Sequence, residues 1–225
     1  TSFLPFTLAE HNVLWAGNRA YTFGGTIATI SDLHTRMIVQ YDPVTGATNV
    51  LPAQLPEGRS QMAAVWDGRV AYLFGGQDPT SQATDTVFIF NPSTGSVTLS
   101  PIRLPYRVEM ASAVWTGSKA YIFVGTDATT GVNFDTVIEF DPNFGSATQI
   151  LLRLPHPVHA ASAVWDGNAA YLFGGTISDG STAASPNPNL IVKFVPPTGT
   201  YPGSVGPMTA RRASPPAHSR PLSQR

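Results

Sequence analysis

A motif of about fifty residues occurs four times in this chain, and this repetition limits the fold more than any other feature. Each copy contains a tryptophan, followed by an apolar stretch that ends at a glycine. The tryptophans are separated by 51, 49 and 50 positions: Trp15, Trp66, Trp115 and Trp165. A fixed period of this length indicates one supersecondary unit that has been copied, so the fold follows from one unit and its repetition.

The second unit shows the expected elements. Residues 60–66 form a run of small and apolar residues that ends at Asp67-Gly68, a pair typical of tight hairpin turns because glycine accepts a positive φ. Residues 70–74 read as a second strand, rich in aromatic and branched side chains. Gly75-Gly76 ends this strand, where a side chain would block the departing chain or a neighbouring backbone.

The same unit continues with two more strands. After a variable polar segment, residues 85–90 read as a third strand, and residues 96–99 as a fourth, more polar one. The turn between them, residues 91–95, has a proline that presets φ and a glycine for the left-handed position. The unit is therefore a four-stranded antiparallel sheet.

The other units keep the same turn signals. The turn between the third and fourth strands recurs at residues 42–46, 141–145 and, more loosely, 195–199. A Leu-Pro pair stands eleven residues before each tryptophan, beginning at Leu4, Leu55, Leu104 and Leu154. Four-stranded antiparallel units repeated radially form a β-propeller, an all-β fold in which blades stack face to face. This stacking explains the uninterrupted apolar run of residues 71–74, because both faces of such a strand are buried.

This pattern resembles the Kelch-repeat family, the galactose-oxidase-like β-propellers. The resemblance rests on the double glycine after an aromatic strand, the tyrosine before it, the Asp-Pro-x-Thr-Gly turn and the period of fifty, and it covers roughly residues 3 to 205. Three departures stand out. Val124 replaces the first glycine of the third unit, the arginine common after Leu-Pro is clear only as Arg59, and the repeating tryptophan ends the first strand instead of starting the outer one.

The domain organisation follows from the repeat boundaries. We expect one propeller over residues 1–206, with repeats at about 4–54, 55–103, 104–153 and 154–206. Residues 207–225 are rich in Pro, Ser and Arg without periodicity, and we expect a disordered tail there.

The number of blades leaves two alternatives. Members of the Kelch family usually have six or seven blades, sometimes five, and this chain supplies four. It either forms part of a larger propeller, which we favour because it begins inside a repeat, or closes as a four-bladed ring.

Composition excludes several function classes. The formal net charge is −1 and there is no long apolar run, so we expect neither nucleic-acid binding nor a membrane span. The chain has no cysteine, which excludes disulfides and thiolate sites and slightly favours the cytoplasm, although nothing in the sequence fixes the compartment. A copper radical oxidase of the galactose-oxidase type, which the resemblance would allow, needs a cysteine and is excluded too.

Binding residues are expected on the loops between the second and third strands and on the segments after each Leu-Pro pair, which lie on one face of a Kelch-like propeller. Polar residues concentrate there. The candidates are Arg59, Gln61, Gln77, Asp78, Arg107, Glu109, Asp127, His156, His159 and Asp179, together with Glu10 and His11. The structural alternative for each is an ordinary solvated loop residue.

No catalytic, metal or cofactor site emerges. The chain lacks a Gly-x-Ser-x-Gly elbow, a phosphate-binding glycine loop and a His-Glu-x-x-His motif. His156 and His159 stand three apart, but a zinc site needs three or four ligands and no carboxylate accompanies this pair. We therefore predict no catalytic residue, no bound metal and no cofactor.

The resemblance implies a non-catalytic module that binds a protein or peptide through its variable loop face. The alternatives are an enzyme or small-molecule or carbohydrate site on the same face, and a structural part of a longer propeller without separate activity. The identity of the partner and the oligomeric state are not fixed by the sequence.

Overall fold

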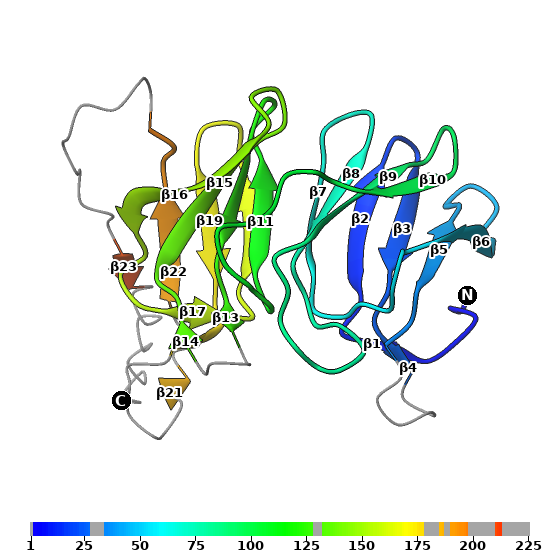
Figure 1. The fold of residues 1–225 in the computed structure, drawn as a ribbon, viewed down its shortest axis with the longest axis horizontal. Helices are drawn as coiled ribbons and strands as arrows, with labels where there is room; N and C mark the ends of the chain where they lie inside the picture. The colour runs from blue at the N-terminus through cyan, green and yellow to red at the C-terminus, as the bar shows by residue number, and fades with distance from the viewer. Residues whose placement is uncertain are drawn as a thin grey trace, which may run out of the picture.

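Four antiparallel sheets of four strands each make up the body of the molecule. The computed structural model describes residues 2–27, 34–127, 132–177, 185–186, 190–197 and 210–212. Within these ranges all regular structure is β, and no helix is long and apolar enough to span a membrane. The structure thus confirms the expected all-β propeller of four-stranded blades (Figure 1).

The first two blades have meander topology, with each strand paired to the next. Blade 1 contains β2 (Asn12–Ala16), β3 (Arg19–Phe23), β5 (Met37–Tyr41) and β6 (Thr48–Gln54). Blade 2 contains β7 (Ala63–Trp66), β8 (Ala71–Phe74), β9 (Val87–Asn91) and β10 (Ser96–Leu99).

The last two blades repeat this order. Blade 3 contains β11 (Ser112–Trp115), β12 (Ala120–Phe123), β15 (Thr136–Asp141) and β16 (Ser146–Arg153). Blade 4 contains β18 (Ser162–Trp165), β19 (Ala170–Phe173), β22 (Leu190–Phe194) and β23 (Ala210–Arg212). β23 lies within segment 207–225, whose other residues are outside the described ranges.

Short strands gather at one end of the blades, the lower end in Figure 1, while the β-hairpin turns lie at the other. They form three small sheets: β1 (Leu8–Ala9) with β4 (Thr26–Ile27), β13 (Thr126–Asp127) with β14 (Val132–Asn133), and β17 (Val158–His159) with β20 (Thr176–Ile177) and β21 (Ser185–Pro186).

The predicted turns have the expected geometry. In the turn between β5 and β6, the Asp42 carboxylate accepts the Val44 N–H at 2.9 Å, and Gly46 donates to the Asp42 carbonyl at 2.8 Å with φ +73°. The turn between β9 and β10 closes in the same way from Gly95 to Asn91, also at 2.8 Å. Local side chain–backbone bonds therefore set these turns, as the Asx-Pro-x-x-Gly pattern predicts.

The core consists of one cluster at each interface between consecutive blades. At each interface an aromatic ring from the third strand of one blade packs between a tyrosine and a phenylalanine from the second strand of the blade before it. Phe140 lies 5.0 Å from both Tyr72 and Phe74, measured between ring centroids. This packing explains why all four residues of β8 and of β12 are buried, and why alternation of polar and apolar residues is lost there.

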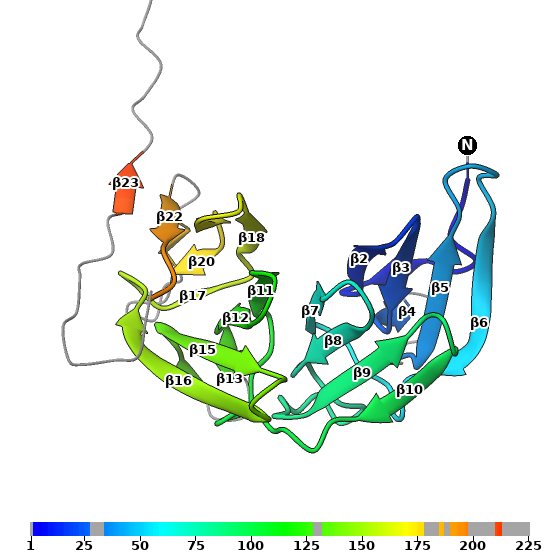
Figure 2. The same cartoon turned by 90° about the horizontal axis from the view of Figure 1, so that it is seen from above.

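The blades lie along an open arc with their inner strands toward its concave side (Figure 2). The inner strand β7 contacts β2 and β11, and β11 contacts β18. Among the described residues β2 and β18, at the two ends of the row, form no comparable contact. Blades 2 and 3 are consequently covered on both faces, whereas blades 1 and 4 each have one face without a neighbouring blade in the described part of the chain.

Candidate functional site

In every repeat the segment that follows the Leu-Pro pair is held against the loop that follows the second strand. In repeats 1 and 4 this contact is the pairing of β1 with β4 and of β17 with β20. In repeats 2 and 3 it is made by single bridges, Ser60 with Gln77 and Glu109 with Thr126. Both kinds of variable segment therefore lie at the same end of the blades, which we call the loop face (Figure 1).

A row of backbone hydrogen bonds crosses the loop face where the segments enter the inner strands. Gln61 N–H donates to the Glu10 carbonyl at 2.9 Å, Met110 N–H to the Gln61 carbonyl at 3.1 Å, and Ala160 N–H to the Met110 carbonyl at 2.9 Å. All four residues have φ between 52° and 56°, in the left-handed region. Non-glycine residues rarely adopt this conformation, and it persists only where surrounding contacts impose it.

A groove of about 370 Å³ opens beside this row. This axial groove is lined by Glu10, His11, Gln61, Met62 and Met110, with alanines from the third and fourth repeats completing its wall. Its walls are mostly apolar, with a few polar groups, and its volume lies in the range of small ligand-binding clefts.

Two polar atoms of the groove lining are buried without a hydrogen-bond partner among the described residues. They are Gln61 Oε1 and His11 Nδ1. Burial lowers the pKa of His11 below its usual value, although the interaction of the imidazole with the Leu8 backbone acts in the opposite direction. An imidazole with a lowered pKa is neutral near pH 7, so His11 and Gln61 can hydrogen-bond to a polar ligand without placing a charge in the groove.

The comparisons with known proteins agree with this architecture. The family model of the KLHDC2/KLHL20/DRC7 Kelch-repeats domain matches residues 10–188, about four fifths of the chain. The chain belongs to the Kelch-repeat family. No curated protein matches this Kelch-repeat chain significantly.

Arg59 and Glu109, two of the predicted binding residues of this Kelch-repeat chain, are buried. Arg59 has no exposed surface, donates hydrogen bonds to Thr84 and to the carboxylate of Glu57, and lies 5.1 Å from the centroid of the Phe88 ring. Burial lowers the pKa of Arg59, an effect that the Glu57 carboxylate opposes. The exposed fraction of Glu109 is 2%. These positions give both side chains contacts within the propeller.

Gln77 and Asp78 shape the loop after β8. The Gln77 backbone pairs with Ser60 and with Ala83. The Asp78 carboxylate accepts N–H groups from Thr80 at 2.8 Å and Gln82 at 3.1 Å. Burial raises the pKa of Asp78, but a hydrogen bond from the Thr80 hydroxyl, these two N–H groups and the nearby Arg59 charge together outweigh it, and the pKa lies below its usual value. The observed contacts of Asp78 are thus those of a loop-closing residue.

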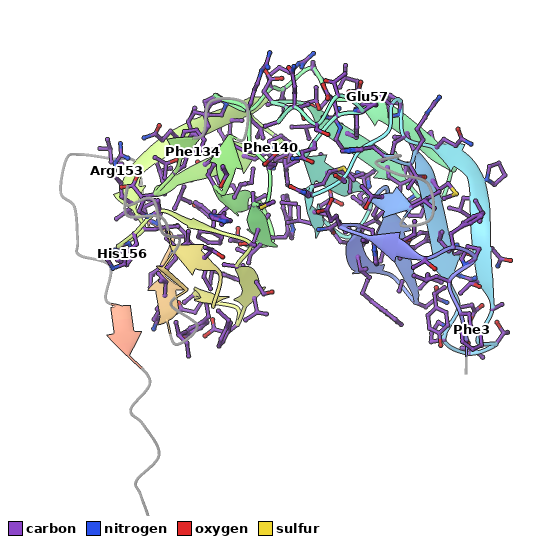
Figure 3. The ribbon with its side chains drawn as sticks, turned by 90° about the horizontal axis from the view of Figure 1, so that it is seen from below. Phe3, Glu57, Phe134, Phe140, Arg153 and His156 are labelled. Atoms are coloured by element: carbon purple, nitrogen blue, oxygen red, sulfur yellow. The ribbon has the colours of Figure 1, made fainter. Side chains whose placement is uncertain are left out.

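Arg107, His156 and His159 follow the Leu-Pro pairs of repeats 3 and 4. Arg107 and His156 are exposed, and His156 lies toward the convex side of the arc (Figure 3). His159 is half-buried on β17; its Nδ1 has no partner among the described residues, and burial lowers its pKa. His156 is therefore in solvent, whereas His159 is partly covered by the blade.

The remaining predicted residues fall at the limits of the described ranges. Asp127 ends β13, and Asp179 lies outside the described residues. Among the predicted binding residues that the structure describes, Gln61 alone lines the axial groove, where it joins Glu10 and His11.

Met62, Met110 and Ala160 are groove residues that the sequence analysis did not single out. A signal for them is present, because the left-handed residue stands six positions after the leucine of each Leu-Pro pair. The four copies are Glu10, Gln61, Met110 and Ala160, and their differing chemistry conceals that they share a position.

Proposed function

We propose that this chain is a protein- or peptide-binding module that uses its loop face, with the axial groove at the centre of the binding surface. Kelch-repeat propellers commonly mediate protein interactions. The observation that carries the proposal is the groove itself, in which Gln61 Oε1 and His11 Nδ1 are buried without partners among the described residues. A buried polar atom without a hydrogen bond costs about 1–3 kcal/mol, which a ligand that supplies the bond recovers.

The four residues with a left-handed backbone conformation also favour the loop face as the binding surface. Glycine is the residue that adopts φ near +55° without steric cost, yet none of the four repeats has glycine there. Each position instead presents a side chain at the rim of the groove: a carboxylate at Glu10, an amide at Gln61, a thioether at Met110 and a methyl group at Ala160. Methionine adapts its shape to varied apolar partners, and the polar groups add direction, which suits a peptide with mixed side chains.

Arg107 extends this surface with a charge. It is exposed on the segment that leads to Met110 in the third repeat. A rim charge of this kind steers a partner and fixes its register more than it adds affinity. A peptide that spans the groove and the neighbouring segment would place an acidic residue near Arg107.

The proposal is tested with a library of random peptides displayed on phage and selected on the immobilised chain. The selected peptides are then measured against the variants Gln61→Ala and Arg107→Glu. We expect each variant to weaken binding about tenfold or more, equivalent to about 1.4 kcal/mol.

Arg69→Glu is the matched control, because Arg69 is an exposed arginine in the turn between β7 and β8, at the opposite end of the blade. It should leave peptide affinity unchanged. Equal losses in Arg107→Glu and Arg69→Glu would place the peptides elsewhere, and a selection that enriches no peptide above an unrelated protein would refute the proposal.

A further inference from the structure

The outer face of blade 4 has the composition of an interblade interface but is exposed. The second strand of each blade ends in a phenylalanine. In the first three blades this residue packs against the following blade, and Phe23, Phe74 and Phe123 are at most 2% exposed. The fourth copy, Phe173, is 45% exposed, and the neighbouring Val164 is 52% exposed. Blade 4 thus presents apolar side chains where the preceding blades are covered.

Blade 1 exposes the other half of the same interface. Trp115 of blade 3 stacks on Tyr72 of blade 2, with ring centroids 6.2 Å apart. The equivalent tryptophan of blade 1, Trp15, is 54% exposed, as is Val13 beside it. Tyr41 occupies in β5 the register position of the third-strand phenylalanines, opposite the alanine that begins the apolar run of β3. Figure 2 shows that this face and that of blade 4 bound the open side of the arc.

The two glycines that follow β19 in blade 4 correspond to glycines that contact the next repeat in blade 2. A Cβ added to Gly75 would lie 2.4 Å from the Val108 carbonyl oxygen of the next repeat, and Gly76 donates its N–H to that carbonyl at 2.8 Å. Gly174 keeps the same left-handed conformation, with φ +66°, but among the described residues no atom lies within 4 Å of its Cβ position. The N–H of Gly175 has no such acceptor in the described ranges either.

The row of hydrogen bonds across the loop face ends in two complementary groups. Within the part of the chain that the structure describes, the Glu10 N–H has no backbone acceptor and the Ala160 carbonyl has no backbone donor. Between consecutive repeats, the N–H and the carbonyl at this position are joined by a hydrogen bond. The two ends of the molecule therefore match in backbone hydrogen bonding as well as in side-chain packing.

We propose that two copies of this chain associate head to tail, with blade 1 of one copy packed on blade 4 of the other as consecutive blades pack within the chain. Trp15 then stacks on Tyr171, replacing the Lys193 ammonium that lies over this ring in the single copy. The Leu8 carbonyl, which is equivalent to that of Val108, accepts the Gly175 N–H. The contact is heterologous, so it leads to a closed ring or to a longer assembly according to the rotation between copies. The aromatic and glycine contacts that carry this inference lie outside the axial groove, although Glu10 and Ala160, at the two ends of the row, also line it. The tests below measure association and not peptide binding, so their failure is distinguishable from failure of the proposed function.

The first test compares two phenylalanine substitutions by light scattering coupled to size-exclusion chromatography. The unmodified chain should show a mass above the 23.9 kDa of one copy, and this mass should rise with concentration. Phe173→Glu should return the mass to one copy. Phe144→Glu, at a turn residue that is 85% exposed, should not change the association.

The second test distinguishes head-to-tail association from contact between identical faces. Phe173→Glu blocks the blade 4 face and Trp15→Glu blocks the blade 1 face, so each variant alone should be monomeric. A mixture of the two should form a dimer through the one intact pair of faces. Association of Trp15→Glu with itself, or the absence of a dimer in the mixture, would overturn the proposal.

The third test uses Gly174, whose equivalent Gly75 lies against the next repeat. Gly174→Ala adds a Cβ that meets no described atom in one copy but would collide with the Leu8 carbonyl in the assembly, so association should be lost. Gly95→Ala is the control, since Gly95 has φ +67° and equally open surroundings, and gives the same backbone strain without the collision. A wild-type chain that is monomeric at every concentration, or an assembly equally sensitive to both substitutions, refutes the inference.

Discussion

Replacing Arg59 tests whether this side chain stabilises the propeller instead of contacting a partner. The Arg59→Ala variant loses a charge-assisted hydrogen bond to Thr84, a cation–π contact with Phe88 and the packing of a fully buried stem. The first is worth about 1.5–3 kcal/mol and the second about 0.5–2 kcal/mol. The ion pair with Glu57 adds little, since Glu57 is 47% exposed. With the lost packing of the aliphatic part of the side chain included, we expect the free energy of unfolding to decrease by about 3–5 kcal/mol.

The loss is measured by urea denaturation followed by tryptophan fluorescence, because Trp66 packs in the same interblade cluster as Phe88. Arg59→Met keeps an unbranched apolar stem and removes a buried Nε that has no partner among the described residues, so it should cost only about 1–2 kcal/mol. Arg107→Ala, at an exposed arginine of the next repeat, should change stability by less than about 0.5 kcal/mol. If Arg59→Ala costs less than about 1 kcal/mol, the buried contacts do not stabilise the fold and the reasoning is wrong.

Two further perturbations examine the core and its pH dependence. Phe140→Ala opens a cavity between two aromatic rings of blade 2 and should lower the free energy of unfolding by about 3–5 kcal/mol in the same denaturation assay. Phe144→Ala, at the exposed turn, should lower it by less than about 0.5 kcal/mol. Similar losses in the two variants would contradict the packing of the core between blades. Burial lowers the pKa values of His11 and His159, so the unfolded chain binds more protons than the folded chain below about pH 6.5. The free energy of unfolding should therefore be constant above that pH and decrease as the pH falls through it. Replacing both residues with glutamine should flatten this fall, with His156→Gln as the control, and an unchanged slope would exclude these imidazoles as its source.

The scaffold was predictable from the sequence because its rules are local and repeated. A turn such as residues 91–95 is closed by bonds within five residues, from Gly95 to Asn91, so its sequence contains the whole reason for its shape. The double glycine is a repeated signal with a non-local cause, since Gly75 has a positive φ and its Cβ position lies 2.4 Å from the Val108 carbonyl oxygen of the next repeat. Four copies of such signals at one period left few alternatives to blades.

The candidate site was less predictable because its side chains are placed by distant partners. Arg59 follows a Leu-Pro pair in a polar segment and reads as a surface residue, yet Phe88 and Thr84, more than twenty positions along the chain, enclose it. The left-handed conformation of Met110 was equally hidden, because Met110 is held by a hydrogen bond to Gln61 of the neighbouring repeat. A residue type indicates what chemistry is available, but burial depends on which repeat lies beside it.

The row of left-handed residues explains how one scaffold can carry different side chains at the surface where we propose that a partner binds. The hydrogen bonds between its members use only backbone atoms, so they form whether the side chain is that of Glu10, Gln61, Met110 or Ala160. In a repeat protein each unit contacts only its neighbours, and a side chain at the rim of the groove adds no constraint on the rest of the fold. Charge, amide, thioether and methyl groups can therefore occupy one backbone position without disturbing the blades. These four positions differ in side-chain chemistry but share one backbone conformation, and they line the axial groove, where we propose that a partner binds.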